Sequence, residues 1–204
     1  MSKTQITLEE QLDRWNQNMQ RASQAEERLS QLTCPRMLEL APFDESSRPI
    51  RSVERSMMQV SPHLVETFRN LVCGKAKWPL YLFGAAGSGK TMAAMSLCDF
   101  VKGSYYTTVE TLMDDVMSGD GDCWPEIRNA GLAVLDELGC RIKTTDLEYS
   151  SVKRFCDARE MYARRVAIYV SNVEPDVIAS QYDARIADRV LCGTVVKLND
   201  KSRR

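Results

Sequence analysis

Residues 80–91 read Leu80-Tyr-Leu-Phe-Gly-Ala-Ala-Gly-Ser-Gly-Lys-Thr91, and they decide the fold class. An apolar strand runs into the pattern Gly84-x-x-x-x-Gly89-Lys90-Thr91, and a helix that begins Met92-Ala-Ala-Met follows it. Glycines let such a loop turn tightly, so that successive backbone N–H groups point at a phosphate, and the positive end of the helix dipole adds to the attraction. The stretch therefore predicts a P-loop that binds a nucleoside triphosphate.

Two side chains of this loop have separate tasks. Lys90 supplies a point charge for the β- and γ-phosphates, and the Thr91 hydroxyl is suited to hold Mg²⁺. We therefore expect ATP and Mg²⁺ as the ligands of the loop. The residues expected to bind them are Gly84, Ala85, Ala86, Gly87, Ser88, Gly89, Lys90, Thr91 and Met92.

The composition is that of a globular protein. Of the 204 residues, 44% are hydrophobic and 27% charged, and the net charge of −1 argues against a surface coated with basic side chains for nucleic acid. No apolar run approaches the ~20 residues of a membrane helix, and the N-terminus has no apolar signal region. The seven cysteines include no C-x-x-C pair, which is typical of reduced thiols, so we expect a cytoplasmic protein.

The chain divides into three parts. Residues 1–33 contain an expected helix over 7–33 that begins with the capping box Thr7–Glu10 and carries a narrow apolar seam. Two interpretations of this seam stay open: it packs on the chain's own domain, or it binds a partner or a second copy. Residues 34–60 hold three prolines and are expected to form a linker. Residues 61–204 form the expected ATPase domain.

From residue 79 onward strands alternate with helices, which predicts an α/β fold of the P-loop NTPase type with a five-stranded parallel sheet flanked by helices. A second capping box, Thr145–Glu148, opens one of these helices. The strands are expected at 80–83, 105–109, 132–136, 166–172 and 194–198, and the helices at 61–74, 90–102, 110–118, 125–129, 145–163, 175–181 and 183–191.

Polar residues end two of the strands. Asp136 and Glu137 follow the apolar stretch that starts at Leu132, and Asn172 ends the next strand. Ligands of open α/β sheets bind beyond the carboxyl ends of the strands, where the P-loop also lies. We expect Asp136 to orient Mg²⁺ and its waters, Glu137 to polarise an attacking water, and Asn172 to hydrogen-bond the γ-phosphate and that water. The pattern predicts ATP hydrolysis.

Five segments together carry a resemblance to a known family. They are Gly84-Ala-Ala-Gly-Ser-Gly-Lys-Thr91, Leu132-Ala-Val-Leu-Asp-Glu-Leu-Gly139, Val170-Ser-Asn172, Tyr182-Asp-Ala-Arg-Ile-Ala-Asp-Arg-Val190 and Asp200-Lys-Ser-Arg203. In this order they resemble the AAA+ ATPases of the helicase-loader group, DnaC and DnaI, and the related transposition helper IstB. The resemblance covers roughly residues 60–204 and implies an AAA+ domain without a C-terminal helical lid.

The resemblance implies a role for each matching residue. Glu137 matches the hydrolytic glutamate, Asn172 matches sensor 1, and Arg203 matches sensor 2. Arg189 matches the arginine finger that enters the site of a neighbouring subunit, with Arg185, one turn earlier, as its rival. A homo-oligomer that contacts through Arg189 is therefore expected.

The resemblance also implies partners. The leading hypothesis is an ATP-dependent loader that binds a hexameric replicative helicase through residues 1–33 and touches single-stranded DNA. Within residues 103–129, Tyr105, Tyr106 and Trp124 are candidates for stacking on bases, although core packing suits the tyrosines better because the segment has few basic residues. Two alternatives stay open: an IstB-like transposition helper that binds duplex DNA, and a nucleotide-dependent regulatory module with little turnover.

Overall fold

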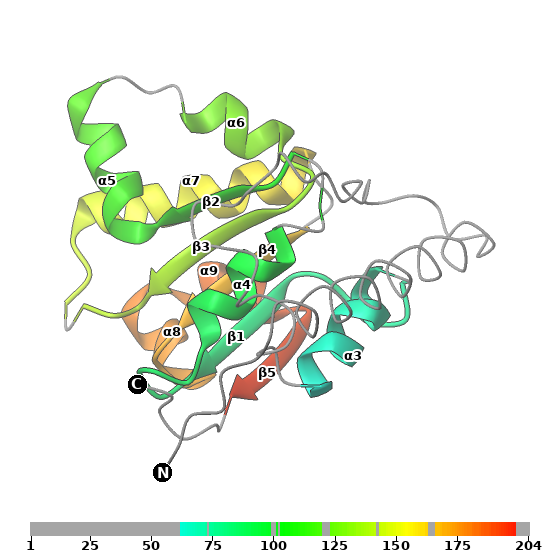
Figure 1. The fold of residues 1–204 in the computed structure, drawn as a ribbon. Helices are drawn as coiled ribbons and strands as arrows, with labels where there is room; N and C mark the ends of the chain where they lie inside the picture. The colour runs from blue at the N-terminus through cyan, green and yellow to red at the C-terminus, as the bar shows by residue number, and fades with distance from the viewer. Residues whose placement is uncertain are drawn as a thin grey trace, which may run out of the picture. The chain divides into compact units, whose positions relative to one another are not determined.

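One sheet of five parallel strands organises the described part of the chain (Figure 1), in the order β2-β3-β4-β1-β5. The structure, a computed structural model, describes residues 62–72, 74–98, 101, 103–119, 123–141, 143–162 and 166–198. The strands are β1 (Leu80–Gly84), β2 (Tyr105–Thr108), β3 (Ala133–Leu138), β4 (Ala167–Ser171) and β5 (Thr194–Leu198). The expected sheet is confirmed. The expected helix 7–33, the linker 34–60 and Arg203 lie outside the described residues.

Helices cover both faces of this sheet (Figure 1). They are α3 (Pro62–Val72), α4 (Lys90–Cys98), α5 (Val109–Ser118), α6 (Cys123–Asn129), α7 (Asp146–Tyr162), α8 (Pro175–Gln181) and α9 (Ala184–Leu191). One core holds α3 and α4 against side chains such as Leu82 and Ile168. A second core holds α5 to α9 against the opposite face, through residues such as Tyr81 and Tyr169. Strands β1, β3 and β4 lie in the middle of the sheet and are buried on both faces, which explains why their sequences are largely apolar without alternation.

The ends of several elements differ from the expectation by a few residues. Val109 begins helix α5 instead of ending strand β2, because the Thr108 hydroxyl caps the helix by accepting a 3.0 Å hydrogen bond from the Thr111 N–H. Strand β3 runs on to Leu138 instead of ending at Asp136. None of the described helices is long and apolar enough to cross a membrane.

The second capping box forms only in part. The Thr145 hydroxyl accepts a 3.2 Å hydrogen bond from the Glu148 N–H, as a capping box requires. The Glu148 carboxylate does not complete the reciprocal half. It is buried and accepts a 2.6 Å hydrogen bond from the Tyr182 hydroxyl. The Glu148 side chain, which the local pattern assigned to the helix end, therefore makes a tertiary hydrogen bond to Tyr182 instead.

Candidate nucleotide-hydrolysis site

The P-loop joins the carboxyl end of β1 to the first turn of α4. Gly84, Gly87 and Gly89 have φ values of 147°, 79° and 92°, a region that side chains disfavour. A Cβ atom at Gly84 would also overlap the backbone oxygen of Leu198 on β5. The tight turn predicted from the glycines is therefore required both by the backbone conformation and by the neighbouring strand.

Lys90 lies folded against the inside of this loop. Its ammonium donates hydrogen bonds to the backbone oxygens of Gly84 (2.9 Å) and Ala85 (2.8 Å) and to the Ser88 hydroxyl (3.4 Å). Burial lowers the pKa of Lys90, and the negative charge of Asp136 acts in the opposite direction. These three hydrogen bonds hold the Lys90 ammonium in place inside the loop. Thr91 and Met92 follow in the first turn of α4, both partly buried.

Asp136 lies on the face of the sheet that carries α4. Its neighbour two residues earlier, Val134, packs in the α3–α4 core, and side chains alternate along a strand. Asp136 is 3% exposed. Its Oδ2 accepts a 2.8 Å hydrogen bond from the Tyr106 hydroxyl, and its Oδ1 accepts a 2.7 Å hydrogen bond from the Glu137 N–H. Both oxygens accept hydrogen bonds from neutral donors, which fixes the orientation of the carboxylate.

A β-bulge sets the direction of Glu137. In the pairing of β3 with β4, Leu135 lies opposite Tyr169 and Leu138 lies opposite Ser171, so β3 carries one residue more than β4 over this interval. Leu135 and Leu138 both pack in the core of α5 to α9, although they are three residues apart. Glu137 lies in the bulge and has a φ of 62°, the one positive φ of a non-glycine residue in the described ranges. The bulge leaves Glu137 exposed at the carboxyl edge.

A hollow lies beside Glu137. It has a volume of about 200 Å³ and is lined by Val109, Glu110, Glu137, Cys140, Arg141 and Glu148. This volume exceeds the ~30 Å³ share of a single water molecule in the liquid, so water has access to the Glu137 carboxylate.

Asn172 completes the group of predicted site residues at this edge. It follows β4, is exposed, and its side-chain amide donates to the Cys140 sulfur at 3.5 Å. Strands β3, β4 and β1 are neighbours in the sheet, so the structure brings Glu137, Asn172 and the P-loop to the same end.

The two arginines of α9 lie apart from this group. Arg189 forms ion pairs within its own chain, to Asp157 (2.5 Å) and Glu160 (2.8 Å) on α7, and its side chain is 28% exposed. Arg185 is exposed and has no ion pair with any described residue. Within the described ranges neither arginine bonds to the P-loop, Asp136 or Glu137, so the choice between them as an arginine finger stays a prediction.

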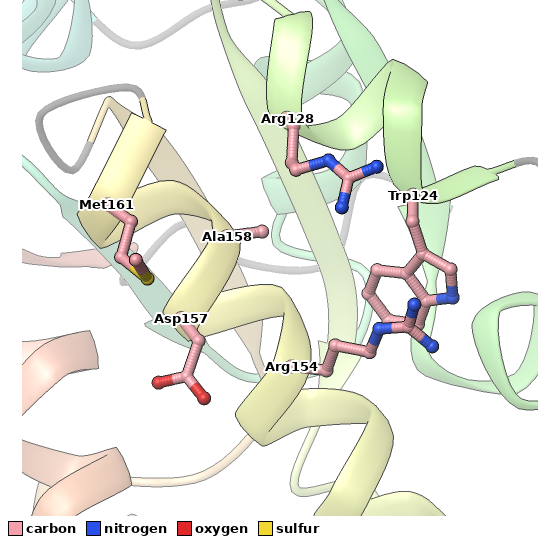
Figure 2. Close-up of a pocket in the computed structure, with 6 residues that line it drawn as sticks. All are labelled: Trp124, Arg128, Arg154, Asp157, Ala158 and Met161. Atoms are coloured by element: carbon pink, nitrogen blue, oxygen red, sulfur yellow. The ribbon is translucent and has the colours of Figure 1, made fainter.

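A second hollow lies between α6 and α7, away from the P-loop. Figure 2 shows its six lining residues, with Arg154 lying over the Trp124 ring, 4.1 Å from the ring centroid. Its volume is about 150 Å³. Trp124 is only 3% exposed. Stacking of a base on Trp124, one of the contacts considered from the sequence, would require Arg154 to move.

Two residues of the site were not assigned to it by the sequence. Tyr106 was a candidate for base stacking or core packing, and the structure joins it to Asp136. Tyr182 accepts a 3.1 Å hydrogen bond from the Gly139 N–H, just after Glu137. Both contacts join residues at least 30 positions apart in the sequence, and no local pattern marks such contacts.

Comparisons with known proteins identify the fold. No family model matches the sequence, and no curated protein matches it either. Among solved structures, DnaI is similar with a TM-score of 0.55 and 17% identity over 71% of this chain and 90% of DnaI. The DnaC helicase loader gives a TM-score of 0.51 and 18% identity over 59% of this chain and 77% of DnaC.

The replication initiator DnaA, solved with AMPPCP and single-stranded DNA, is also similar, with a TM-score of 0.55 and 16% identity over 68% of this chain. The match covers 44% of that DnaA chain and 46% of DnaA from Aquifex aeolicus, so the similarity spans less than half of these initiators. The described part of the chain has the fold that the DnaC helicase loader, DnaI and part of the replication initiator DnaA share.

Proposed function

We propose that this chain is a Mg²⁺-dependent ATPase that acts as a loader of a replicative helicase. The observation that carries the ATPase assignment is the bulge in β3. It holds Glu137 in a left-handed conformation that an ordinary strand residue avoids. Strained backbone of this kind is stored where a side chain must point in one direction. Here that direction is into water, at the end of the sheet that carries the P-loop.

The residues of the site suit a bound Mg²⁺–ATP. Among the described residues no three His, Cys, Asp or Glu side chains converge on one point. Mg²⁺ keeps several waters and is usually held by one or two protein side chains together with phosphates. In this proposal the Thr91 hydroxyl and Asp136 are those side chains. The ion, when bound, neutralises charge between the β- and γ-phosphates.

The chain's own groups then have defined tasks in hydrolysis. The P-loop N–H groups and the Lys90 ammonium bind and orient the phosphates. The Glu137 carboxylate accepts a proton from the attacking water. The Asn172 amide hydrogen-bonds the γ-phosphate and the same water. An arginine of a neighbouring subunit, Arg189 in this proposal, stabilises the charge that develops, an effect worth about 10³–10⁵ in rate where it acts. Isolated subunits should therefore turn over slowly.

The loader role is supported by the fold shared with DnaC and DnaI. Single-stranded DNA is proposed as a ligand because a DnaA of the same fold is known with it. Residues 1–33 are proposed to bind the helicase, and Arg203 is proposed as sensor 2.

Enzymatic activity is tested first, with the full chain and two variants. Lys90→Ala should lose ATP binding, measured with a fluorescent ATP analogue. Glu137→Gln should bind ATP normally and lose about 10²–10⁴ of the hydrolysis rate. Glu110→Gln is the matched control, because Glu110 lines the same hollow but lies on α5 and pairs with Arg141 at 3.8 Å. Normal turnover by Glu137→Gln would refute the assignment of the base. A wild-type chain that binds ATP without turnover would favour the regulatory module.

The role is tested separately. The full chain should retain a hexameric replicative helicase on a column, and a chain lacking residues 1–33 should not. Single-stranded DNA should stimulate ATP hydrolysis more than duplex DNA does, with a salt dependence that reflects phosphate contacts. Stronger stimulation by duplex DNA would favour the IstB-like alternative.

A further inference from the structure

The Tyr182 hydroxyl joins the turn after β3 to the start of α7, two segments that no local sequence pattern connects. Its hydroxyl accepts a 3.1 Å hydrogen bond from the Gly139 N–H, two residues after Glu137. The same hydroxyl donates a 2.6 Å hydrogen bond to Oε1 of Glu148, at the start of α7. Tyr182 is 8% exposed and Glu148 is 1% exposed, so water does not compete freely for these groups. Burial, and then the hydrogen bond to Glu148, raises the pKa of Tyr182 further above its ordinary value of 10.0.

The turn after Glu137 is packed directly against the end of α8. A Cβ atom at Gly139 would lie 2.6 Å from Oε1 of Gln181 and 3.2 Å from Cδ1 of Ile178. The Gln181 side-chain amide donates a 3.1 Å hydrogen bond to the Arg141 backbone oxygen. This turn (residues 139–141) therefore has little room to shift unless α8 and Tyr182 shift with it.

On its other side, Tyr182 leads into the arginine-bearing helix. Asp183 caps α9 by accepting a 2.7 Å hydrogen bond from the Ile186 N–H. Arg185 lies in the first turn of α9, and Arg189 lies one turn further along. A change in the position of Tyr182 must therefore change the start of the helix that carries both arginines.

We propose that Tyr182 is a positioning residue that couples the orientation of Glu137 to the position of helix α9. Its hydroxyl transmits the coupling in both directions. When α9 contacts a neighbouring subunit, the turn at Gly139 is set and Glu137 is held toward the attacking water. When nucleotide displaces Glu137, α9 moves. The proposal rests on the ATPase function proposed above and adds a link between assembly and hydrolysis.

The test replaces Tyr182 by Phe in the full chain, which removes one hydroxyl and keeps the ring. We expect kcat for ATP hydrolysis to fall about tenfold, because the substitution removes both hydrogen bonds of the hydroxyl and with them the restraint on the turn. The dissociation constant for ATP should stay near the wild-type value, because the P-loop is not touched. The matched control is Tyr149→Phe, because the Tyr149 hydroxyl donates a 2.7 Å hydrogen bond to Asp183 at the same corner, and no hydrogen bond joins it to the turn among the described residues.

A second measurement does not depend on turnover. Hydrogen exchange is followed in residues 137–141 and 184–191 with and without AMPPCP. In the wild type and in Tyr149→Phe, the nucleotide should change exchange in both segments. In Tyr182→Phe it should change exchange in 137–141 alone. A purely structural role predicts lower thermal stability with both segments still responding.

The outcomes separate the two proposals. Equal kcat for Tyr182→Phe and Tyr149→Phe, or a response of α9 that survives in Tyr182→Phe, would overturn the coupling. Binding of AMPPCP without ATP turnover in the wild type would overturn the ATPase function, while the exchange pattern still decides the coupling. A wild-type chain that binds no nucleotide would overturn both.

Discussion

The hydroxyl of Tyr106 on β2 donates a 2.8 Å hydrogen bond to Oδ2 of Asp136 on β3. The other carboxylate oxygen, Oδ1, accepts from the Glu137 N–H at 2.7 Å. Together the two donors fix the plane of a buried carboxylate that is proposed to orient Mg²⁺ and its waters. Strand β2 thus contributes to the site, although it supplies none of the residues proposed to contact ATP.

Tyr106→Phe should raise the Mg²⁺ concentration that ATP hydrolysis requires. Loss of a partner that orients a metal-binding side chain typically costs about 10–100-fold in metal affinity or activity. We expect the Mg²⁺ concentration for half-maximal ATP hydrolysis to rise within that range. The control is Tyr105→Phe, because Tyr105 packs against the opposite core. An unchanged Mg²⁺ requirement in Tyr106→Phe would show that Asp136 does not depend on this hydrogen bond.

Glycine at position 137 should relieve backbone strain. The left-handed conformation costs a residue with a Cβ about 1–2 kcal/mol, and glycine avoids this cost. Glycine is more flexible in the unfolded chain, however, and this flexibility lowers the stability of the folded state by about 0.5–1 kcal/mol. Glu137→Gly should therefore be at least as stable to urea as Glu137→Ala. At Lys153, an exposed position inside α7, the order should reverse, with glycine about 1 kcal/mol less stable than alanine. The same order at both positions would argue against strain at Glu137.

Arg159 should be a large contributor to stability. Its buried guanidinium donates to the backbone oxygens of Ile127 (2.6 Å), Ala130 (2.9 Å) and Val166 (2.6 Å), which ties α6 and the start of β4 to α7. Burial lowers the pKa of Arg159 to about 10, still well above neutral pH. Because Arg159→Leu removes the charged donor of the hydrogen bonds to these three backbone oxygens, we expect a loss of about 2–4 kcal/mol in the free energy of unfolding.

The control for Arg159 lies on the same helix. Arg154 is exposed and contacts the Trp124 ring, so Arg154→Leu should cost only about 0.5–1 kcal/mol in urea unfolding. Equal losses in the two variants would mean that the backbone contacts of Arg159 carry little of the stability.

Arg185 and Arg189 should differ in stability and in subunit mixing. Arg189→Ala removes two partly exposed ion pairs and should cost about 1 kcal/mol in the free energy of unfolding, whereas Arg185→Ala should cost less than about half of that. Mixing Arg189→Ala with Lys90→Ala subunits should restore part of the ATP hydrolysis, because the intact P-loop of one subunit meets the intact Arg189 of the other. If mixing with Lys90→Ala subunits restores ATP hydrolysis to Arg185→Ala but not to Arg189→Ala, Arg185 is the arginine finger instead.

Acid should weaken the cap of α9. Hydrogen bonds from the Ile186 N–H and then from the Tyr149 hydroxyl lower the pKa of Asp183 below its ordinary value of 3.8. A carboxyl group whose pKa is lower in the folded state stabilises the fold above its unfolded-state pKa and loses this effect as the pH falls. The free energy of unfolding of the wild type relative to Asp183→Asn, which does not titrate, should be constant near neutral pH and decline below about pH 4. A constant difference at all pH values would contradict the cap.

The sequence by itself determined the P-loop, the parallel sheet and the edge of the sheet at which Asp136, Glu137 and Asn172 lie. These features follow from short-range patterns: glycine spacing, apolar runs of strand length, and polar residues directly after them. The chemistry of a phosphate loop needs contiguous backbone N–H groups, so its signal is contiguous in the sequence as well.

Only the tertiary structure decided how these residues are held. The bulge that exposes Glu137 depends on the pairing of β3 with β4, and the hydroxyls of Tyr106 and Tyr182 reach partners 30 and 43 positions away. Glu148 accepts a hydrogen bond from Tyr182 instead of completing the expected capping box. Arg189 forms ion pairs with Asp157 and Glu160 on another helix. Strand register and helix docking are set by packing of the whole core, so neither local periodicity nor propensity can specify them.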